Sequence, residues 1–148
     1  MKYFTINELT KSATAVKLGI ANIPSTAEKA NLEALIDNIL DPLRSAWGKP
    51  IVVNCGYRCE ALNKAVKGEA NSQHKRGQAA DIEALSRDPE ENKALFNLAR
   101  ALRLPFDQLI NEFGYNWLHI SYNNGGVQRG EVREAKTVGG KTVYPLVK

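Results

Sequence analysis

The chain has 148 residues, of which 43% are hydrophobic and 24% are charged. This ordinary globular usage excludes wholesale disorder, a collagen-like repeat and a coiled coil, and the length suits a single domain over residues 1–148. The net charge of +4 is too modest to indicate nucleic acid as a partner. No apolar run is long enough to span a membrane, and the opening residues do not form a signal peptide. We therefore expect a soluble globular protein.

The first half of the chain predicts two helices around a short strand. Ser25 and Glu28 form a capping-box pattern, and apolar residues then recur at helical spacing, which predicts one long amphipathic helix. Pro42 is expected to bend this helix. The β-branched run Ile51–Asn54 predicts a buried strand, and residues 60–67 predict a short helix.

The second half is dominated by predicted strands. A small-apolar run predicts a strand over Ala79–Ala84, and Asp88–Pro89 are typical of the start of a helix. Residues 107–113 and 116–123 alternate as paired strands, and the tail predicts a hairpin that turns at Gly139–Gly140. Together these elements predict an α+β domain, with helices packed on one face of a small, largely antiparallel sheet.

The only two cysteines, Cys55 and Cys59, are too few for the disulfide framework of a small secreted domain. We interpret them as reduced thiols of a protein in a reducing compartment. The alternative is a zinc-binding pair, but the second cysteine pair that usually completes such a site is absent.

The candidate chemistry lies in the only two histidines, His74 and His119, each of which stands beside a predicted strand. His74 precedes Asp81 by seven residues, and Gly77 permits a turn between them. Two donors from one loop and strand, with a histidine from another strand, would make a three-ligand site, the usual number for a catalytic zinc. By spacing alone, a His–Asp pair such as His74 and Asp81 is more often a surface hydrogen bond than a metal site.

A set of motif residues gives a more specific signal. The set consists of GYR at Gly56–Arg58, Asn63, then Ser72, His74, Gly77, Ala79 and Asp81 in S-x-H-x-x-G-x-A-x-D, and Trp117 with His119 in W-x-H. With these residues the chain resembles the M15 zinc peptidases. That family includes D-alanyl-D-alanine carboxypeptidases and dipeptidases, and phage endolysins that cleave L-alanyl-D-glutamate bonds. The resemblance covers about residues 50–122.

The resemblance implies that His74, Asp81 and His119 hold one zinc ion per chain. It also implies a hedgehog/DD-peptidase-like fold, in which these ligands line a cleft across the sheet. Because side chains alternate along a strand, Trp117 and His119 should share one face while Leu118 points to the core. Trp117 is then either a core residue or a wall of the substrate groove.

A zinc peptidase also needs a carboxylate that moves a proton between the attacking water and the leaving amine. The family commonly places it three residues before the last ligand histidine, but here that position is Asn116. Glu112 is the nearest carboxylate, and a turn at Gly114 can bring it back toward His119. We therefore expect Glu112 to be the general base, with a solvated strand glutamate as the alternative.

Four further residues are expected to contact substrate. The resemblance implies that Arg58 lies near the scissile bond, where a guanidinium can bind a carbonyl or a carboxylate; a structural salt bridge is the alternative. Ser72 matches the motif serine, which either binds substrate or holds its own loop. Tyr57 and Gln108 are weaker candidates for the groove.

The resemblance thus implies a zinc-dependent metallopeptidase of peptidoglycan stem peptides, and we expect a monomer. The departure at Asn116 supports an alternative, an inert zinc-binding relative that acts as a binding or structural module. A phage nucleic-acid or assembly protein is disfavoured, because Lys and Arg are scattered over the whole chain. Without a signal peptide the expected location is the cytoplasm. From there, a wall hydrolase would reach its substrate by holin-dependent phage lysis, while a dipeptidase would recycle D-amino-acid peptides.

Overall fold

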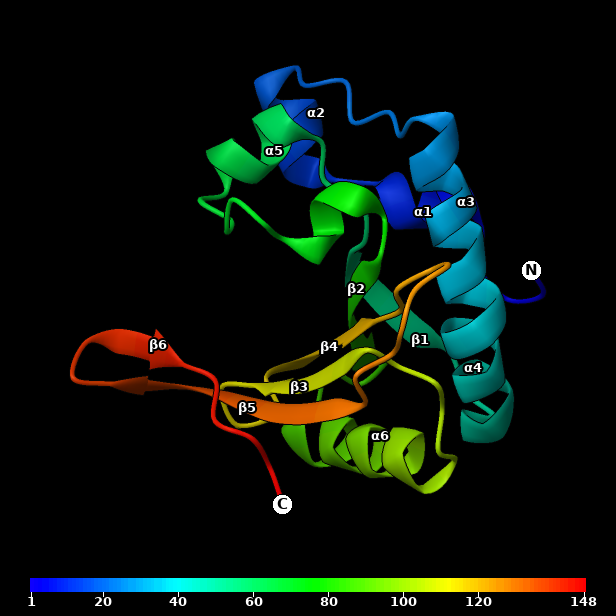
Figure 1. Cartoon of the computed structure of the whole chain (residues 1–148), viewed down its shortest axis with the longest axis vertical. Helices are drawn as coiled ribbons and strands as arrows, with labels where there is room; N and C mark the ends of the chain where they lie inside the picture. Colours follow the sequence, from blue (N-terminus) through cyan, green and yellow to red (C-terminus); the bar gives the residue numbers. More distant parts are fainter.

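A six-stranded sheet organises the fold in a computed structural model, which describes residues 1–148 (Figure 1). The strands are β1 (Ile51–Cys55), β2 (Ala79–Ala84), β3 (Gln108–Glu112), β4 (Trp117–Ser121), β5 (Glu131–Val138) and β6 (Lys141–Val143). They lie in the order β1-β2-β4-β3-β5-β6, and every pair is antiparallel except β3 with β5. The predicted α+β class with a largely antiparallel sheet is therefore confirmed.

The predicted long helix is present as three continuous segments. The helices of the chain are α1 (Ile6–Thr10), α2 (Ala13–Leu18), α3 (Thr26–Leu35), η1 (Ile36–Leu40), α4 (Asp41–Trp47), α5 (Glu60–Ala65), η2 (Gln73–Arg76) and α6 (Pro89–Ala101). Ser25 caps α3 in the expected capping box. The irregularity expected at Pro42 takes the form of a π-helical turn, η1, just before it, because a proline has no N–H for the carbonyl four residues earlier. None of the helices has the length and hydropathy that crossing a membrane requires.

The hydrophobic core lies on one face of the sheet. Side chains alternate along each strand, so β2 and β4 turn their apolar residues to this face. The strand residues of the core include Ala80, Ile82, Leu109, Leu118 and Ile120. They pack with buried residues of α3, η1, α4 and α6, and α6 lies along this side of the sheet in Figure 1. Helices on one face of the sheet are what the sequence predicts.

The opposite face of the sheet carries a row of functional side chains. Residues paired across neighbouring strands point to the same face. One such row runs from Cys55 in β1 through Asp81, His119 and Ile110 to Arg133 in β5. Strand register therefore places Asp81 beside His119, although they are far apart in the sequence.

Two motif glycines fit close approaches of the backbone. A Cβ on Gly56 would meet the carbonyl oxygen of Leu9 at 2.3 Å, and the N–H of Tyr57 donates to that same oxygen at 2.7 Å. Helix α1 is thus docked on the loop that follows β1. Gly77 ends η2 with a φ of +71°, where a Cβ would meet the carbonyl oxygen of Glu28 at 2.6 Å.

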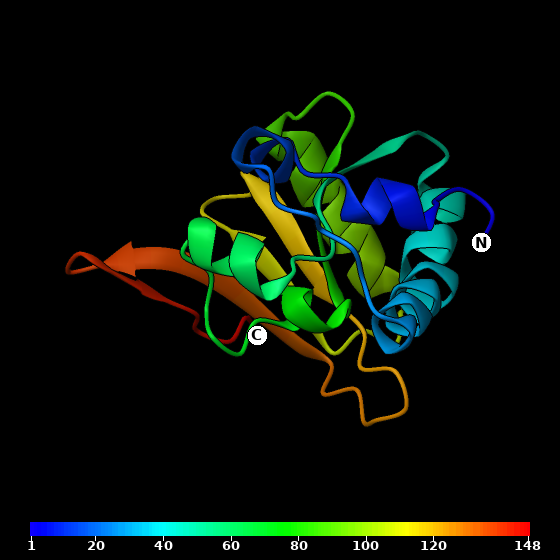
Figure 2. The same cartoon turned by 90° about the horizontal axis from the view of Figure 1, so that it is seen from above.

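The C-terminal hairpin of β5 and β6 turns at Gly139–Gly140, as predicted, and projects from the body of the protein (Figures 1 and 2). After β6 the tail runs back along β5. The Glu134 N–H donates to the Pro145 carbonyl at 3.1 Å, and the Val147 N–H donates to the Val132 carbonyl at 2.8 Å. These bonds fix the tail beside β5.

Candidate active site

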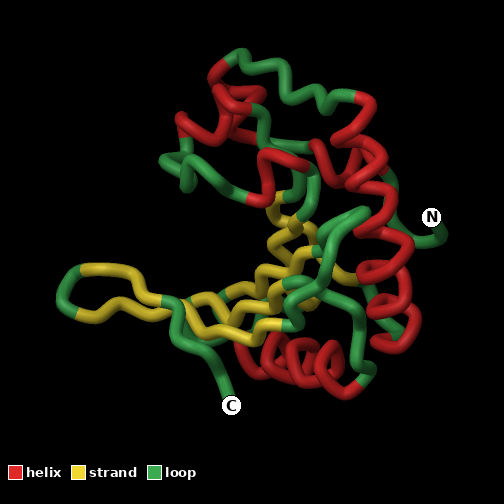
Figure 3. The backbone as a smooth tube through the Cα atoms, in the orientation of Figure 1, coloured by secondary structure: helices red, strands yellow, loops and turns green.

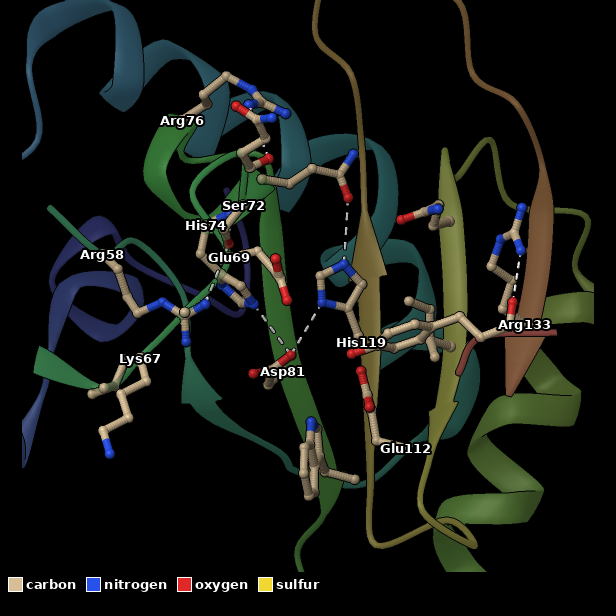
Figure 4. Close-up of a pocket in the computed structure, with 18 of the residues that line it drawn as sticks. Arg58, Lys67, Glu69, Ser72, His74, Arg76, Asp81, Glu112, His119 and Arg133 are labelled. Atoms are coloured by element: carbon tan, nitrogen blue, oxygen red, sulfur yellow. Dashed lines mark hydrogen bonds and ion pairs between the residues drawn. The ribbon is translucent and has the colours of Figure 1, made fainter. Parts of the chain in front are cut away.

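Three side chains converge at the middle of the open face of the sheet (Figure 4). His74 comes from η2, Asp81 from β2 and His119 from β4. Nε2 of His74 and Nδ1 of His119 each lie 3.3 Å from the same carboxylate oxygen, Oδ1 of Asp81. The three side chains are only 4%, 17% and 12% exposed, respectively. The three residues expected to bind zinc are therefore brought together in a nearly buried cluster.

Each imidazole of the cluster is held through its other nitrogen. Nδ1 of His74 donates to the Gly56 carbonyl at 2.6 Å, which leaves Nε2 to face Asp81. Nε2 of His119 lies 3.4 Å from Oε1 of Gln73, which leaves Nδ1 to face Asp81. Two imidazole nitrogens and a carboxylate oxygen directed to one place are donors that fit a zinc ion.

The charges of the cluster are strongly coupled. Burial alone would raise the pKa of Asp81, but His74 and His119 outweigh it and hold that pKa well below its usual range. Burial acts to lower the pKa of His74, yet the Asp81 carboxylate raises it overall. The pKa of His119 is lowered, chiefly by burial. Asp81 is thus ionised and available as a ligand.

Cys55 borders the cluster, a position that the sequence does not predict. Donor atoms of Cys55, His74 and Asp81 lie within 4.8 Å of one another, and both cysteines are free thiols. The Cys55 sulfur lies 3.9 Å from Nδ1 of His74, the nitrogen that already donates to Gly56. Cys55 lies here because it pairs with Asp81 across β1 and β2. The sequence alone does not reveal this pairing.

A cavity of about 820 Å³ opens over the cluster. One side, which we call the loop wall, is formed by residues 58–76, and its connection between α5 and η2 is irregular (Figure 3). The other side, which we call the strand wall, is formed by residues of β3 and β4 with the turn between them, and by Arg129, Arg133 and Tyr144. Figure 4 shows Arg58 and Lys67 on the loop wall and Arg133 on the strand wall, with Asp81 and His119 between them.

Glu112 lies on the strand wall, and its side chain points toward the cluster (Figure 4). It is only 8% exposed. Burial raises its pKa to about 7, and the nearby charge of Asp81 adds to this effect. Glu112 pairs with Trp117 across β3 and β4, so the turn at Gly114 brings it back toward the cluster as expected. A solvated strand glutamate does not fit this position.

Trp117 also lines the cavity rather than the core. Its ring lies 5.7 Å from that of Phe113, measured between centroids. Leu118, the next residue, is fully buried on the core face, in agreement with the expected alternation. Trp117 and Phe113 thus form an aromatic border of the strand wall.

Arg58 and Ser72 meet on the loop wall. Nη2 of Arg58 donates to Oγ of Ser72 at 3.2 Å, and the same oxygen accepts the backbone N–H of His74 at 3.2 Å. Ser72 therefore holds its loop as the cap of η2 and also lines the cavity. Nε of Arg58 is buried without a hydrogen-bond partner, and Arg58 makes no salt bridge of the kind considered as an alternative.

The two weaker candidates for the groove differ. Gln108 lines the cavity, and its amide donates to Oε1 of Glu131 at 2.9 Å. Tyr57 does not line the cavity: its side chain is 6% exposed and belongs to the hydrophobic core. The expectation for Tyr57 is corrected because the close approach of Leu9 to the loop after β1 turns this residue inward.

Several cavity residues were not singled out from the sequence. They are Lys67 and Gln73 on the loop wall, and Phe113, Arg129, Arg133 and Tyr144 on the strand wall. They carry no motif and come from η2, from β5, from turns and loops and from the tail, so only the tertiary structure brings them to the site.

The fold and site define a class: an α+β domain with a buried His–Asp–His cluster and a cavity glutamate, typical of a zinc peptidase. Residues 2–121 match the family model described as Peptidase M15, and the chain belongs to this family of zinc-dependent peptidases. The match includes the N-terminal fifty residues, in which the sequence analysis found no motif, and ends before β5. A search of curated proteins found no match.

Proposed function

We propose that the protein is a zinc-dependent metallopeptidase that hydrolyses peptide bonds of peptidoglycan stem peptides, as a D-Ala-D-Ala carboxypeptidase or an L-Ala-D-Glu endopeptidase. The observation that carries the proposal is the convergence of two oriented histidines on Asp81, with the Glu112 carboxyl group aimed at them from the strand wall. All of these groups come from one chain, which fits a monomeric enzyme.

His74, Asp81 and His119 would hold a single zinc ion. When bound, zinc supplies a Lewis acid that polarises the scissile carbonyl and lowers the pKa of water. Cys55 is not assigned as a ligand, because its sulfur approaches His74 at the nitrogen that donates to Gly56. Three protein ligands leave room for water and substrate, which is the arrangement of catalytic rather than structural zinc sites.

Glu112 is the general base of the proposed reaction. Its carboxylate accepts a proton from the attacking water and delivers it to the nitrogen of the leaving amine. A pKa of about 7 suits both steps, because the group can gain and lose a proton near neutral pH. The family commonly has a glutamate where this chain has Asn116. We infer that Glu112 takes its role from a different position in the sequence. The carboxylate is then present, which disfavours an inert zinc-binding module.

The loop wall suits an anionic substrate. Arg58 and Lys67 line the cavity without a carboxylate partner in the protein, and Nε of Arg58 has no acceptor. A substrate carboxylate or the carbonyl at the scissile bond would supply the missing acceptor. Stem peptides offer both groups, so this wall supports the assignment of the substrate class.

The test combines zinc content with hydrolysis by the full-length protein. Wild type should carry one zinc ion per chain by elemental analysis and release new amino groups from purified peptidoglycan, and a chelator should abolish the release. His119→Ala should lose the zinc. Glu112→Gln should keep the zinc and lose at least about 100-fold in rate, the usual scale for a general base.

Glu33→Gln is the matched control, because it removes the same charge from an exposed position on α3. It should behave as wild type. Zinc bound without hydrolysis of several wall types would overturn the peptidase assignment, and a protein that binds no zinc would overturn the site.

A further inference from the structure

A chain of hydrogen-bonded side chains leads away from the metal-binding cluster. Nε2 of His119 contacts Oε1 of Gln73 at 3.4 Å, and Nε2 of Gln73 donates to Oδ2 of Asp107 at 2.9 Å. Arg129 completes the chain, since its Nη2 donates to the same Asp107 oxygen at 2.7 Å. None of these contacts takes part in the proposed reaction.

The direction of each hydrogen bond follows from the last pair. Arg129 holds the pKa of Asp107 below its usual range, so this carboxylate is ionised and can only accept. The Gln73 amide must then direct its NH₂ group to Asp107 and its oxygen to His119. That oxygen can only accept, so Nε2 of His119 is the donor in this contact, and Nδ1 is the nitrogen left to face Asp81 and a bound zinc ion.

Asp107 is a rigid end point for this chain. It is 2% exposed, and Arg129 donates its backbone N–H and its Nε to Oδ1 at 2.9 and 3.0 Å. The Asp107 backbone is fixed as well: its N–H donates to the Ser121 carbonyl at 2.8 Å, and its carbonyl accepts from Glu131 at 3.0 Å. The carboxylate therefore cannot easily follow a displaced Gln73.

We propose that Gln73 and Asp107 are positioning residues for the metal site: they hold the His119 ring through Nε2 so that Nδ1 faces the place where zinc would bind. This inference rests on the zinc site of the proposed function. Gln73 precedes His74 in η2, so one short helix places both histidines, one directly and one through an amide. An amide side chain can accept from His119 and donate to Asp107 at once, as Gln73 does here.

The experiment measures zinc affinity of the full-length protein by competition with a chromophoric chelator. Gln73→Leu keeps the size of the side chain and removes both hydrogen bonds. We expect it to bind zinc about 10–100-fold more weakly than wild type, the usual effect of losing such an outer partner. The matched control is Gln78→Leu, because Gln78 is buried and lies near η2 but does not contact His119. It should keep the affinity of wild type.

A second variant tests whether Asp107 acts through Gln73. Asp107→Asn should also weaken zinc binding, but adding it to Gln73→Leu should cause little further loss, because the connection is already broken. In the zinc-bound wild type, where Nδ1 is the expected ligand atom, ¹H–¹⁵N spectra should show an Nε2 proton of His119 that exchanges slowly with solvent because it is bonded to Gln73, and in Gln73→Leu this proton should exchange faster. That spectrum separates positioning from a general loss of stability.

Three results would overturn the inference: equal zinc affinities of Gln73→Leu and Gln78→Leu, losses that simply add in the double variant, or a His119 Nε2 proton that exchanges equally fast in the zinc-bound wild type and Gln73→Leu. If Gln73→Leu fails to fold, Asp107→Asn and the wild-type spectrum still decide. The readouts do not require hydrolysis, so a wild type that binds zinc but cleaves nothing contradicts the proposed function and leaves this inference standing.

Discussion

The two walls of the cavity are built in different ways. On the strand wall, pairing across β3, β4 and β5 fixes where Glu112 and Arg133 lie. On the loop wall the connection between α5 and η2 is irregular, and individual side-chain bonds hold it, such as those that Oγ of Ser72 accepts from Arg58 and from the backbone of His74. Many backbone hydrogen bonds of the sheet thus fix the position of a strand residue, whereas only one or two bonds fix the position of a loop residue.

This difference implies that single substitutions should affect function unequally. On the loop wall, one exchange removes a contact to substrate and also a bond that holds the wall. On the strand wall, an exchange should change only the chemistry of the altered side chain.

Apart from loss of the general base Glu112, the largest effect on activity is expected for Arg58→Lys on the loop wall. Lysine keeps the charge but lacks the planar fork of donors with which the guanidinium bonds Ser72 through Nη2 and can offer its other nitrogens to a substrate acceptor. Losing a hydrogen bond to a charged group costs about 1.5–3 kcal/mol, so kcat/KM on a stem peptide should fall by about 10–100-fold. Arg44→Lys, outside the cavity, is the control. A decrease below twofold at Arg58 would contradict the assigned role.

An intermediate effect is expected for Glu112→Gln on the strand wall. The quantity that should change is the stability of the zinc-free protein. The pKa of Glu112 is raised from 4.5 to about 7 on folding, so between these pH values the folded protein keeps a proton that the unfolded chain releases. Below pH 4.5 the protonated carboxyl group makes its full contribution to stability. This contribution is lost as the pH rises through the folded-state pKa of about 7. Glu112→Gln should therefore be more stable than wild type by about 1–2 kcal/mol at pH 8, after allowance for solvent screening.

Urea unfolding with a chelator at pH 4 and pH 8 checks this prediction. The two proteins should be nearly equal in stability at pH 4. The same difference at both pH values would show that Glu112 is not buried with a raised pKa.

The smallest effect is expected for Tyr144→Phe, also on the strand wall. Tyr144 lines the cavity, and burial, with the charges of Glu112 and Glu69, raises its pKa, so its hydroxyl remains a donor for substrate. Losing one neutral hydrogen bond of about 0.5–1.5 kcal/mol should lower kcat/KM by about 2–10-fold. The melting temperature should not change, because the tail is held through its backbone. An altered melting temperature with unchanged kinetics would assign Tyr144 to stability instead.

Much of the fold could be predicted because the sequence patterns that indicate its helices and strands are local. The strand Ala79–Ala84 and the start of α6 after Asp88 are where the sequence predicts them. Helices α1 and α2 were missed because they have only 5 and 6 residues, too few to show a helical period. The parallel pairing of β3 with β5 was missed because it joins distant segments.

The site was predictable only where residue type restricts the choice. With two histidines in the chain, the motif leads directly to His74 and His119. Gln73 is an ordinary polar loop residue by sequence, and its link to Asp107 depends on how η2 docks beside the start of β3. Tyr57 was wrongly placed in the groove because adjacent motif residues, such as Arg58, do not have to point the same way.

The docking of helix α1 on Gly56 has a consequence for how the chain matures. The Gly56 carbonyl that holds His74 lies on a loop fixed by Leu9, so the N-terminal segment must be in place before that histidine is oriented. Zinc uptake should thus report completion of folding and not formation of the central loop alone. Gly56→Ala, whose Cβ would displace the Leu9 carbonyl, should delay uptake in refolding experiments, and the protein would acquire its metal last.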